Sequence, residues 1–156
     1  MIYSAGIILY KKTKRTTSFL MATPAGPYWT HRTLWSFPKG EVENNEHPII
    51  TAIREFKEET DYDVSVKFTK LKYLGLVRQS KNKSVFVFSL KADPEEYYRK
   101  FNCNSMVTME YPKDSGEIKT FPEIKDIQWI KYEDLMERPR LHAYDSIYNK
   151  IASEEP

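Results

Sequence analysis

Cysteine is nearly absent from this sequence of 156 residues, because Cys103 is the only one. A single thiol excludes a disulfide scaffold and a structural zinc site built from several cysteines. Long apolar runs are also missing, since no stretch approaches the roughly 18 residues that cross a bilayer. The short run Ile7–Leu9 is followed by basic residues, unlike a secretory signal. We therefore expect no membrane span and a cytoplasmic location.

A large excess of charge of one sign is lacking as well. The formal net charge is +2, which does not indicate a general binder of nucleic acid. The charges are nevertheless unevenly spread: residues 40–63 contain eight Asp or Glu against two Lys or Arg, whereas residues 1–39 contain six Lys or Arg and no acid. A solvated acidic helix explains the block on charge alone, and a cation site is the alternative.

Hydrophobic residues make up 40% of the chain, which is enough to form a core, and the length favours a single domain over residues 1–156. The predicted strands are Met1–Tyr10, Ser18–Thr23, one or two within Val64–Val77, Ser84–Ala92 and Ile127–Ile130. The predicted helices are Pro48–Thr60, Pro94–Phe101, Tyr132–Glu137 and Leu141–Ala152. Residues 23–40 and 102–123 are expected to be mostly irregular. Interspersed strands and helices predict a mixed α/β sandwich.

The predicted helix Pro48–Thr60 carries the most informative residues. On a helical wheel, Glu55, Glu58 and Glu59 lie within about 100° of arc, next to the apolar stripe rather than opposite it. The apolar stripe consists of Ile49, Ala52, Ile53 and Phe56. Carboxylates this close repel one another unless a cation compensates them, and Mg²⁺ or Mn²⁺ prefers such oxygen ligands. A solvated acidic helix face remains the simpler explanation of this helix taken alone.

The wider spacing resembles the Nudix box, G-x5-E-x7-R-E-U-x-E-E-x-G-U, in which U is a bulky apolar residue. The positions that match are Gly40, Glu46, Arg54, Glu55, Glu58 and Glu59. The chain departs from the pattern at Asp61, where the family has a glycine just past the helix. Aspartate tolerates the left-handed conformation of that position better than most residues, so we expect the motif to be retained.

The resemblance covers roughly residues 3–150. The segment Trp35–Glu41 is similar to the W-x-x-P-K-G element of Nudix hydrolases that act on dinucleoside polyphosphates and diphosphoinositol phosphates. Residues 120–123 resemble the acid-bearing loop of diadenosine tetraphosphate hydrolases. Together with residues 24–29, these elements resemble most closely a bacterial group of small predicted NTP pyrophosphohydrolases.

The resemblance implies an α/β/α sandwich around a mixed β-sheet, with the box as loop–helix–loop. It also implies hydrolysis of a nucleoside diphosphate linked to another group, by attack of metal-activated water on a phosphorus. The implied metal ligands, for Mg²⁺ or its substitute Mn²⁺, are the Gly40 carbonyl, Glu55, Glu58, Glu59 and Glu123. The same four glutamates form the implied catalytic set, with Glu110 and Glu117 as rivals of Glu123. Glu46 and Arg54 are expected to fix the loop against the helix.

The expected substrate is a small nucleotide, either a dinucleoside polyphosphate or an NTP-like molecule. The residues predicted to bind it are Lys39 and Lys83 for phosphate and Tyr28 and Trp35 for a base. Two alternatives stay open: a diphosphoinositol polyphosphate phosphohydrolase, and a catalytically silent Nudix module that binds nucleotide and regulates. The oligomeric state is not indicated.

Overall fold

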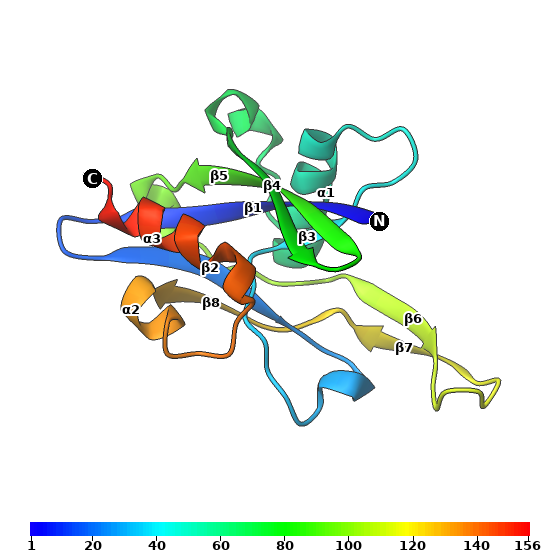
Figure 1. Cartoon of the computed structure of the whole chain (residues 1–156). Coiled ribbons are helices and arrows are strands. Elements are labelled where there is room, and N and C mark those ends of the chain that lie inside the picture. Colours follow the sequence, from blue (N-terminus) through cyan, green and yellow to red (C-terminus); the bar gives the residue numbers. More distant parts are fainter.

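The computed structural model describes residues 1–156 and consists of a mixed β-sheet flanked by helices (Figure 1). The strands are β1 (Ile2–Lys12), β2 (Thr17–Pro24), β3 (Lys39–Glu41), β4 (Lys72–Ser80), β5 (Lys83–Lys91), β6 (Met106–Glu110), β7 (Ile118–Pro122) and β8 (Ile124–Lys131). The α-helices are α1 (Pro48–Thr60), α2 (Tyr132–Leu135) and α3 (Asp145–Ser153). The 3₁₀ helices are η1 (Pro27–Trp29), η2 (Ser65–Lys70), η3 (Pro94–Tyr98) and η4 (His142–Tyr144).

The main sheet has the strand order β4-β5-β1-β2-β8, with β3 also paired to β1. β1 is parallel to β5 and antiparallel to its other partners, so the sheet is mixed, as predicted. Along one edge, β1 pairs with β3 through residues 4–6 and with β2 through residues 10–12. β2 and β3 therefore lie against different parts of the same edge of β1, and the site described below lies where they separate.

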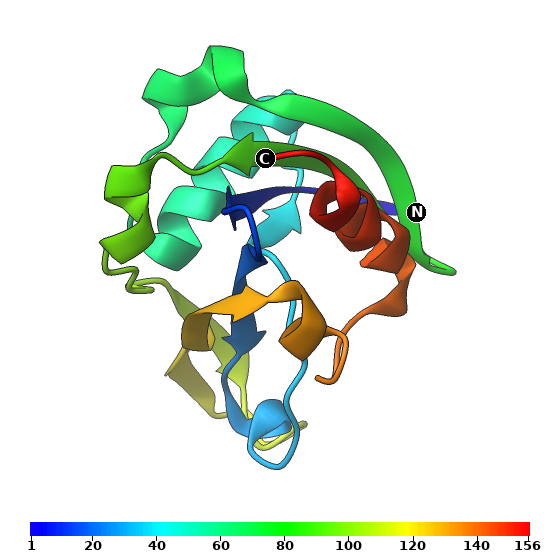
Figure 2. The same ribbon diagram turned by 90° about the vertical axis from the view of Figure 1, so that its left-hand side faces the viewer.

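Helices cover both faces of this sheet, and Figure 2 shows α1 and α3 on opposite sides of β1. On one face, Phe56 of α1 packs in a cluster with Ile7, and on the other, Tyr148 of α3 packs with Ile8 and Phe19. Residues 4–9 of β1 are all buried, because successive side chains point to opposite faces of the sheet and helices cover both faces. The α/β sandwich expected from the sequence is confirmed.

α1 has the predicted bounds and ends at Asp61 in the left-handed conformation, with φ 60° and ψ 27°. The Asp61 N–H donates to the Lys57 carbonyl at 2.8 Å, which closes the helix. A residue past the helix end in this conformation is usually glycine, because glycine has no Cβ to clash there. The aspartate therefore takes the backbone role that the sequence predicted for it.

We expect Asp61→Gly to keep full activity and to leave stability unchanged or raise it by up to about 1 kcal/mol, because glycine adopts this conformation without penalty. The melting temperatures of the two proteins measure the effect. A clear loss of melting temperature would reveal an Asp61 interaction beyond its backbone conformation.

Two expectations about secondary structure are wrong. Residues 102–123, expected to be irregular, contain the hairpin of β6 and β7, which extends away from the main sheet (Figure 1). Within Val64–Val77, residues 65–70 form η2 rather than a strand, and β4 begins only at Lys72. The short β3 was not expected either. No helix of the structure is long and apolar enough to cross a membrane.

Candidate active site

Arg54 joins the loop after β3 to α1. Its guanidinium donates to both carboxylate oxygens of Glu46 at 2.9 Å and to Glu55 Oε1 at 2.8 Å. It also reaches the Glu41 carbonyl at 3.2 Å and Glu58, four residues on, at 3.3 Å. The hydrogen bonds from Arg54 lower the pKa of Glu46 to about 2. Glu46 and Arg54 thus fix the loop against the helix, as predicted.

Glu55 is 8% exposed and lies against Gly40 of β3. A Cβ at Gly40 would overlap the Glu55 carboxyl group, so only glycine fits at this point of the loop. Burial, and then the charge of Glu58, raises the pKa of Glu55 to about 7. The raised pKa indicates that the protein alone does not fully compensate the negative charge of Glu55, even though Arg54 contacts it.

Glu59 is also buried, at 6% exposure, and its Oε2 has no hydrogen-bond partner. Burial raises its pKa well above the usual value, and the charges of Glu123 and Glu55 raise it further. Glu58, in contrast, has a side chain that is 42% exposed and is held by Arg54. The three carboxylates therefore border the buried stripe of α1, but they differ strongly in exposure.

Glu123 follows β7 and is the remote carboxylate that the fold brings to Glu59. The Ser105 hydroxyl donates to it at 2.5 Å. Its rivals lie elsewhere: Glu110 accepts two backbone N–H groups within the β6–β7 turn, and Glu117 pairs with Lys119 at 3.5 Å. Glu123 is therefore the remote carboxylate whose charge reaches the box glutamates.

The carboxylates do not form a preformed cage, because no three Asp, Glu, His or Cys side chains converge as metal ligands. The donor set nevertheless fits a divalent cation. Glu59 Oε2 is a buried oxygen without a partner, and the pKa values of Glu55 and Glu59 are raised by burial and by neighbouring carboxylates. A hard cation takes oxygen ligands and would relieve each of these costs.

Positive charge lies next to these carboxylates. Burial, together with the neighbouring Lys83 ammonium, lowers the pKa of Lys39 to about 8, while Glu59 and Glu55 act in the opposite direction. Lys39 and Lys83 stand at the start of β3 and β5, which flank β1 on its two sides. Carboxylates for a cation and ammonium groups for an anion thus meet at one end of the sheet.

Glu59 and the two lysines open into a cavity of about 330 Å³ between the separated β2 and β3. Its charged lining consists of Lys39, Glu59 and Lys83. The rest of its lining consists of Ala22, Pro24, Trp29, Leu34, Ser36, Phe37, Gln79, Ile124 and Leu141. The cavity therefore has a charged end and a wall that is largely apolar, which is typical of a small-molecule site.

The two aromatic residues predicted to bind a base do not line this cavity. Trp35 is 7% exposed, belongs to the core and has the Arg138 guanidinium 5.0 Å from its ring. Tyr28 is 50% exposed and packs edge-on against Tyr111 of the segment after β6, at 5.8 Å between ring centroids. Trp29, next to Tyr28, lines the cavity instead.

Gln79 and Ser36 also line the cavity, and the sequence analysis did not select them. Gln79 shares the inward side of β4 with Val77, so a polar residue at an inward position was the available signal. The predicted strand ended at Val77, two residues too early. Ser36 lay in a segment expected to be irregular, and its bridge to Ala22 of β2 carries it to the site.

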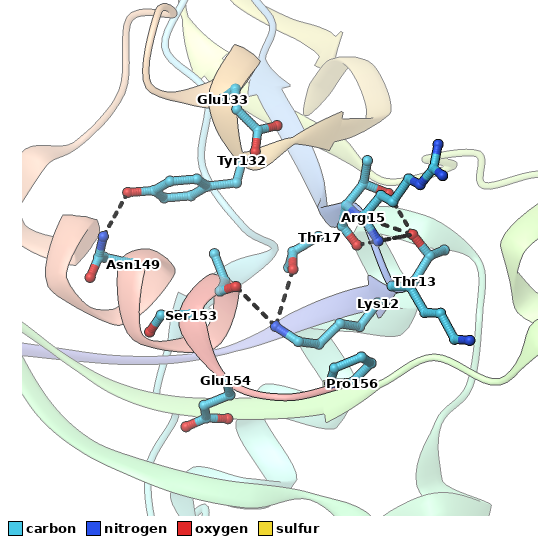
Figure 3. A pocket seen from close by; sticks show the side chains of 13 residues that line it. Lys12, Thr13, Arg15, Thr17, Tyr132, Glu133, Asn149, Ser153, Glu154 and Pro156 are labelled. Carbon is cyan, nitrogen blue, oxygen red and sulfur yellow. Dashed lines mark hydrogen bonds between the residues drawn. The ribbon is translucent and has the colours of Figure 1, made fainter.

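A second cavity of about 330 Å³ lies at the tip of the β1–β2 hairpin, against α2 and α3 (Figure 3). Lys12 points into it, but its ammonium already donates to Thr17 and to the Ile151 and Ala152 carbonyls at the end of α3. A lysine at that position compensates the unpaired carbonyls of a helix C-terminus. Lys12 is therefore engaged as a helix cap and does not offer a free ammonium group to a ligand in this cavity.

The sequence matches the family model described as the NUDIX domain over residues 2–150. Among curated proteins, the chain is 27% identical over 138 residues to m7GpppN-mRNA hydrolase dcap-2 of Caenorhabditis elegans. That alignment covers 81% of this chain but 14% of the relative, so the chain spans only a small part of it.

Two solved structures illustrate the shared fold. A C. elegans Ap4A hydrolase binary complex has a TM-score of 0.56 and 20% identity, with coverage of 97% of this chain and 95% of that one. The NUDIX domain of Shewanella oneidensis NrtR, complexed with ADP ribose, has a TM-score of 0.66 and 12% identity, with coverage of 97% and 86%. At these identities, the likeness establishes the fold.

Proposed function

The chain belongs to the Nudix family of hydrolases, and from this premise we propose that it is a metal-dependent pyrophosphohydrolase acting on a nucleoside diphosphate linked to a second group. The observation that carries the proposal is the meeting of the buried Glu59 carboxylate, whose pKa is raised by Glu123 and Glu55, with two lysines at the charged end of one cavity. A polyphosphate substrate requires both charge neutralisation and a correctly placed water.

In this proposal, Glu55, Glu58, Glu59, Glu123 and the Gly40 carbonyl hold Mg²⁺, with Mn²⁺ as a substitute. When bound, the cation would neutralise the charge of the polyphosphate and would make a water easier to deprotonate. Lys39 and Lys83 hold the phosphates by charge-assisted hydrogen bonds. The apolar wall beyond them excludes water from the uncharged part of the substrate and orients it.

The cavity favours a nucleotide over an inositol pyrophosphate. Its wall beyond the lysines carries Trp29 and several aliphatic side chains, which suit a planar base better than a ring bearing a phosphate on most of its carbons. A catalytically silent module is the alternative from another class. Release of phosphate-containing products in the presence of Mg²⁺ separates an enzyme from a silent binder.

We expect a dinucleoside tetraphosphate to be among the better substrates, cut asymmetrically into a nucleoside triphosphate and a monophosphate. The two lysines at the charged end, beside the proposed cation site, offer positive charge for a chain of several phosphates. Chromatography of the products, with ¹⁸O-labelled water to mark the attacked phosphorus, measures the outcome. Turnover no faster than that of ADP-ribose or a simple NTP would reject this substrate and leave the hydrolase assignment intact.

A further inference from the structure

The amide of Gln79 is held in one orientation at the cavity wall. The Tyr144 hydroxyl donates to Gln79 Oε1 at 2.7 Å. Tyr144 is fully buried, and its ring packs edge-on against Phe37 at 4.8 Å between centroids. Burial raises the pKa of Tyr144, so its hydroxyl stays protonated and remains a donor. The oxygen of Gln79 is thereby occupied, and its NH₂ group is left to face the cavity.

The cavity also contains a surface for a flat ring. Trp29 lines the cavity, and the Arg32 guanidinium lies over its ring, 4.1 Å from the centroid. Ser36 also lines the cavity, and its buried Oγ has no hydrogen-bond partner in the protein. The cavity therefore offers apolar walls, the amide of Gln79 and one buried hydroxyl that has no partner in the protein.

We propose that Gln79, oriented by Tyr144, is the residue that selects the base of the substrate, and that it selects bases with a carbonyl group on the edge that enters the cavity. The proposal rests on the proposed function and names the substrate class of that same site. An amide NH₂ can donate to the carbonyl of hypoxanthine, guanine or uracil. Facing the exocyclic amino group of adenine or cytosine, two donors would meet and one would lose its hydrogen bond.

Matched nucleotides test this selection, because inosine and adenosine, like uridine and cytidine, differ at the group in question. We expect ITP to have a kcat/KM about tenfold above that of ATP, and UTP to exceed CTP similarly. The base with a carbonyl group accepts a hydrogen bond from Gln79, whereas the base with an amino group leaves that donor unpaired. Calorimetric binding of IMP and AMP provides a second readout that needs no turnover, since neither monophosphate contains an anhydride bond.

A substitution at the same position should reverse the preference. In Gln79→Glu, one carboxylate oxygen keeps the Tyr144 hydrogen bond and the other presents an acceptor to the base, so AMP should bind better than IMP. Tyr144→Phe keeps the ring against Phe37 but releases the amide, which can then rotate. We expect this variant to bind IMP and AMP with nearly equal affinity.

The two proposals fail in different ways. If no nucleotide is hydrolysed but IMP still binds better than AMP, the proposed function fails and the selection by Gln79 stands. Equal binding of IMP and AMP to the unmodified protein, tighter binding of AMP, or no binding of either would overturn the selection. An unchanged preference in Gln79→Glu would overturn it as well, whatever the enzyme hydrolyses.

Discussion

Glu59→Gln should lower turnover by at least about a hundredfold while the protein stays folded. The substitution keeps the volume of the side chain but removes the charge of a buried oxygen proposed to hold Mg²⁺, and such charge stabilisation is worth several kcal/mol in the transition state. Glu58→Gln should also lose most turnover, although its side chain is far more exposed. Initial rates over a range of Mg²⁺ concentrations measure both effects.

Stability provides a readout of Glu59 that does not depend on activity. Without metal, burial and the charges of Glu123 and Glu55 raise the pKa of Glu59, so its ionised form destabilises the fold at neutral pH. Glu59→Gln should therefore melt at the same or a higher temperature in EDTA, and it should lose the stabilisation that Mg²⁺ gives the unmodified protein. Glu43→Gln, in the same acidic block but with a side chain 69% exposed, serves as the control. Normal turnover of Glu58→Gln and Glu59→Gln at saturating Mg²⁺ would contradict the metal assignment.

The sequence predicts α1 to the residue, because its apolar spacing, its initial Pro48 and its end at Asp61 are all local signals. η2 shows the limit of such patterns. Val64, Val66 and Phe68 alternate as in a strand, yet Val66 is 87% exposed and the Asp63 side chain accepts the Ser65 N–H at 2.9 Å. That local hydrogen bond begins a turn, which a period of two does not reveal.

The β6–β7 hairpin was missed for a different reason. Pro112 and the pair Ser115-Gly116 are turn signals that are typical of an irregular segment, but here they lie in the turn that joins the two strands. Glu110 supports that turn by accepting the N–H groups of Asp114 and Gly116. The same residues are thus compatible with a loop or a hairpin, and the pairing of the flanking strands decides between them.

The charged end of the site could be predicted because Gly40, Glu46, Arg54 and the box glutamates lie within one stretch of the chain. The residues of the cavity wall could not be predicted from the sequence in this way. Trp29, Ser36 and Gln79 come from three separate elements, and they meet only because β2 and β3 take different parts of β1 while β4 lies beyond β5. Residues that the sheet topology brings together from distant parts of the chain cannot be recognised from the spacing of residues within one segment.

Gly40→Ala should damage both the fold and the site. Its Cβ would overlap the Glu55 carboxyl group, so the Glu55 side chain, β3 or the helix must shift. Overpacking of this kind costs about 1–3 kcal/mol, which corresponds to a fall in melting temperature of roughly 2–4 °C per kcal/mol for a domain of this size. Turnover should fall by about a hundredfold, because Glu55 leaves its position beside Glu59.

A second substitution separates the overlap from a general loss of folding. Glu55→Asp shortens the side chain by one methylene, so in the Gly40→Ala background it should restore much of the melting temperature and none of the turnover. Glu41→Ala changes an exposed side chain at the adjacent position and should leave the melting temperature unchanged. If Gly40→Ala melts like the unmodified protein and stays active, the close packing of Gly40 on Glu55 is not required. If the double variant melts no higher than Gly40→Ala alone, the loss comes from the β3 backbone rather than from Glu55.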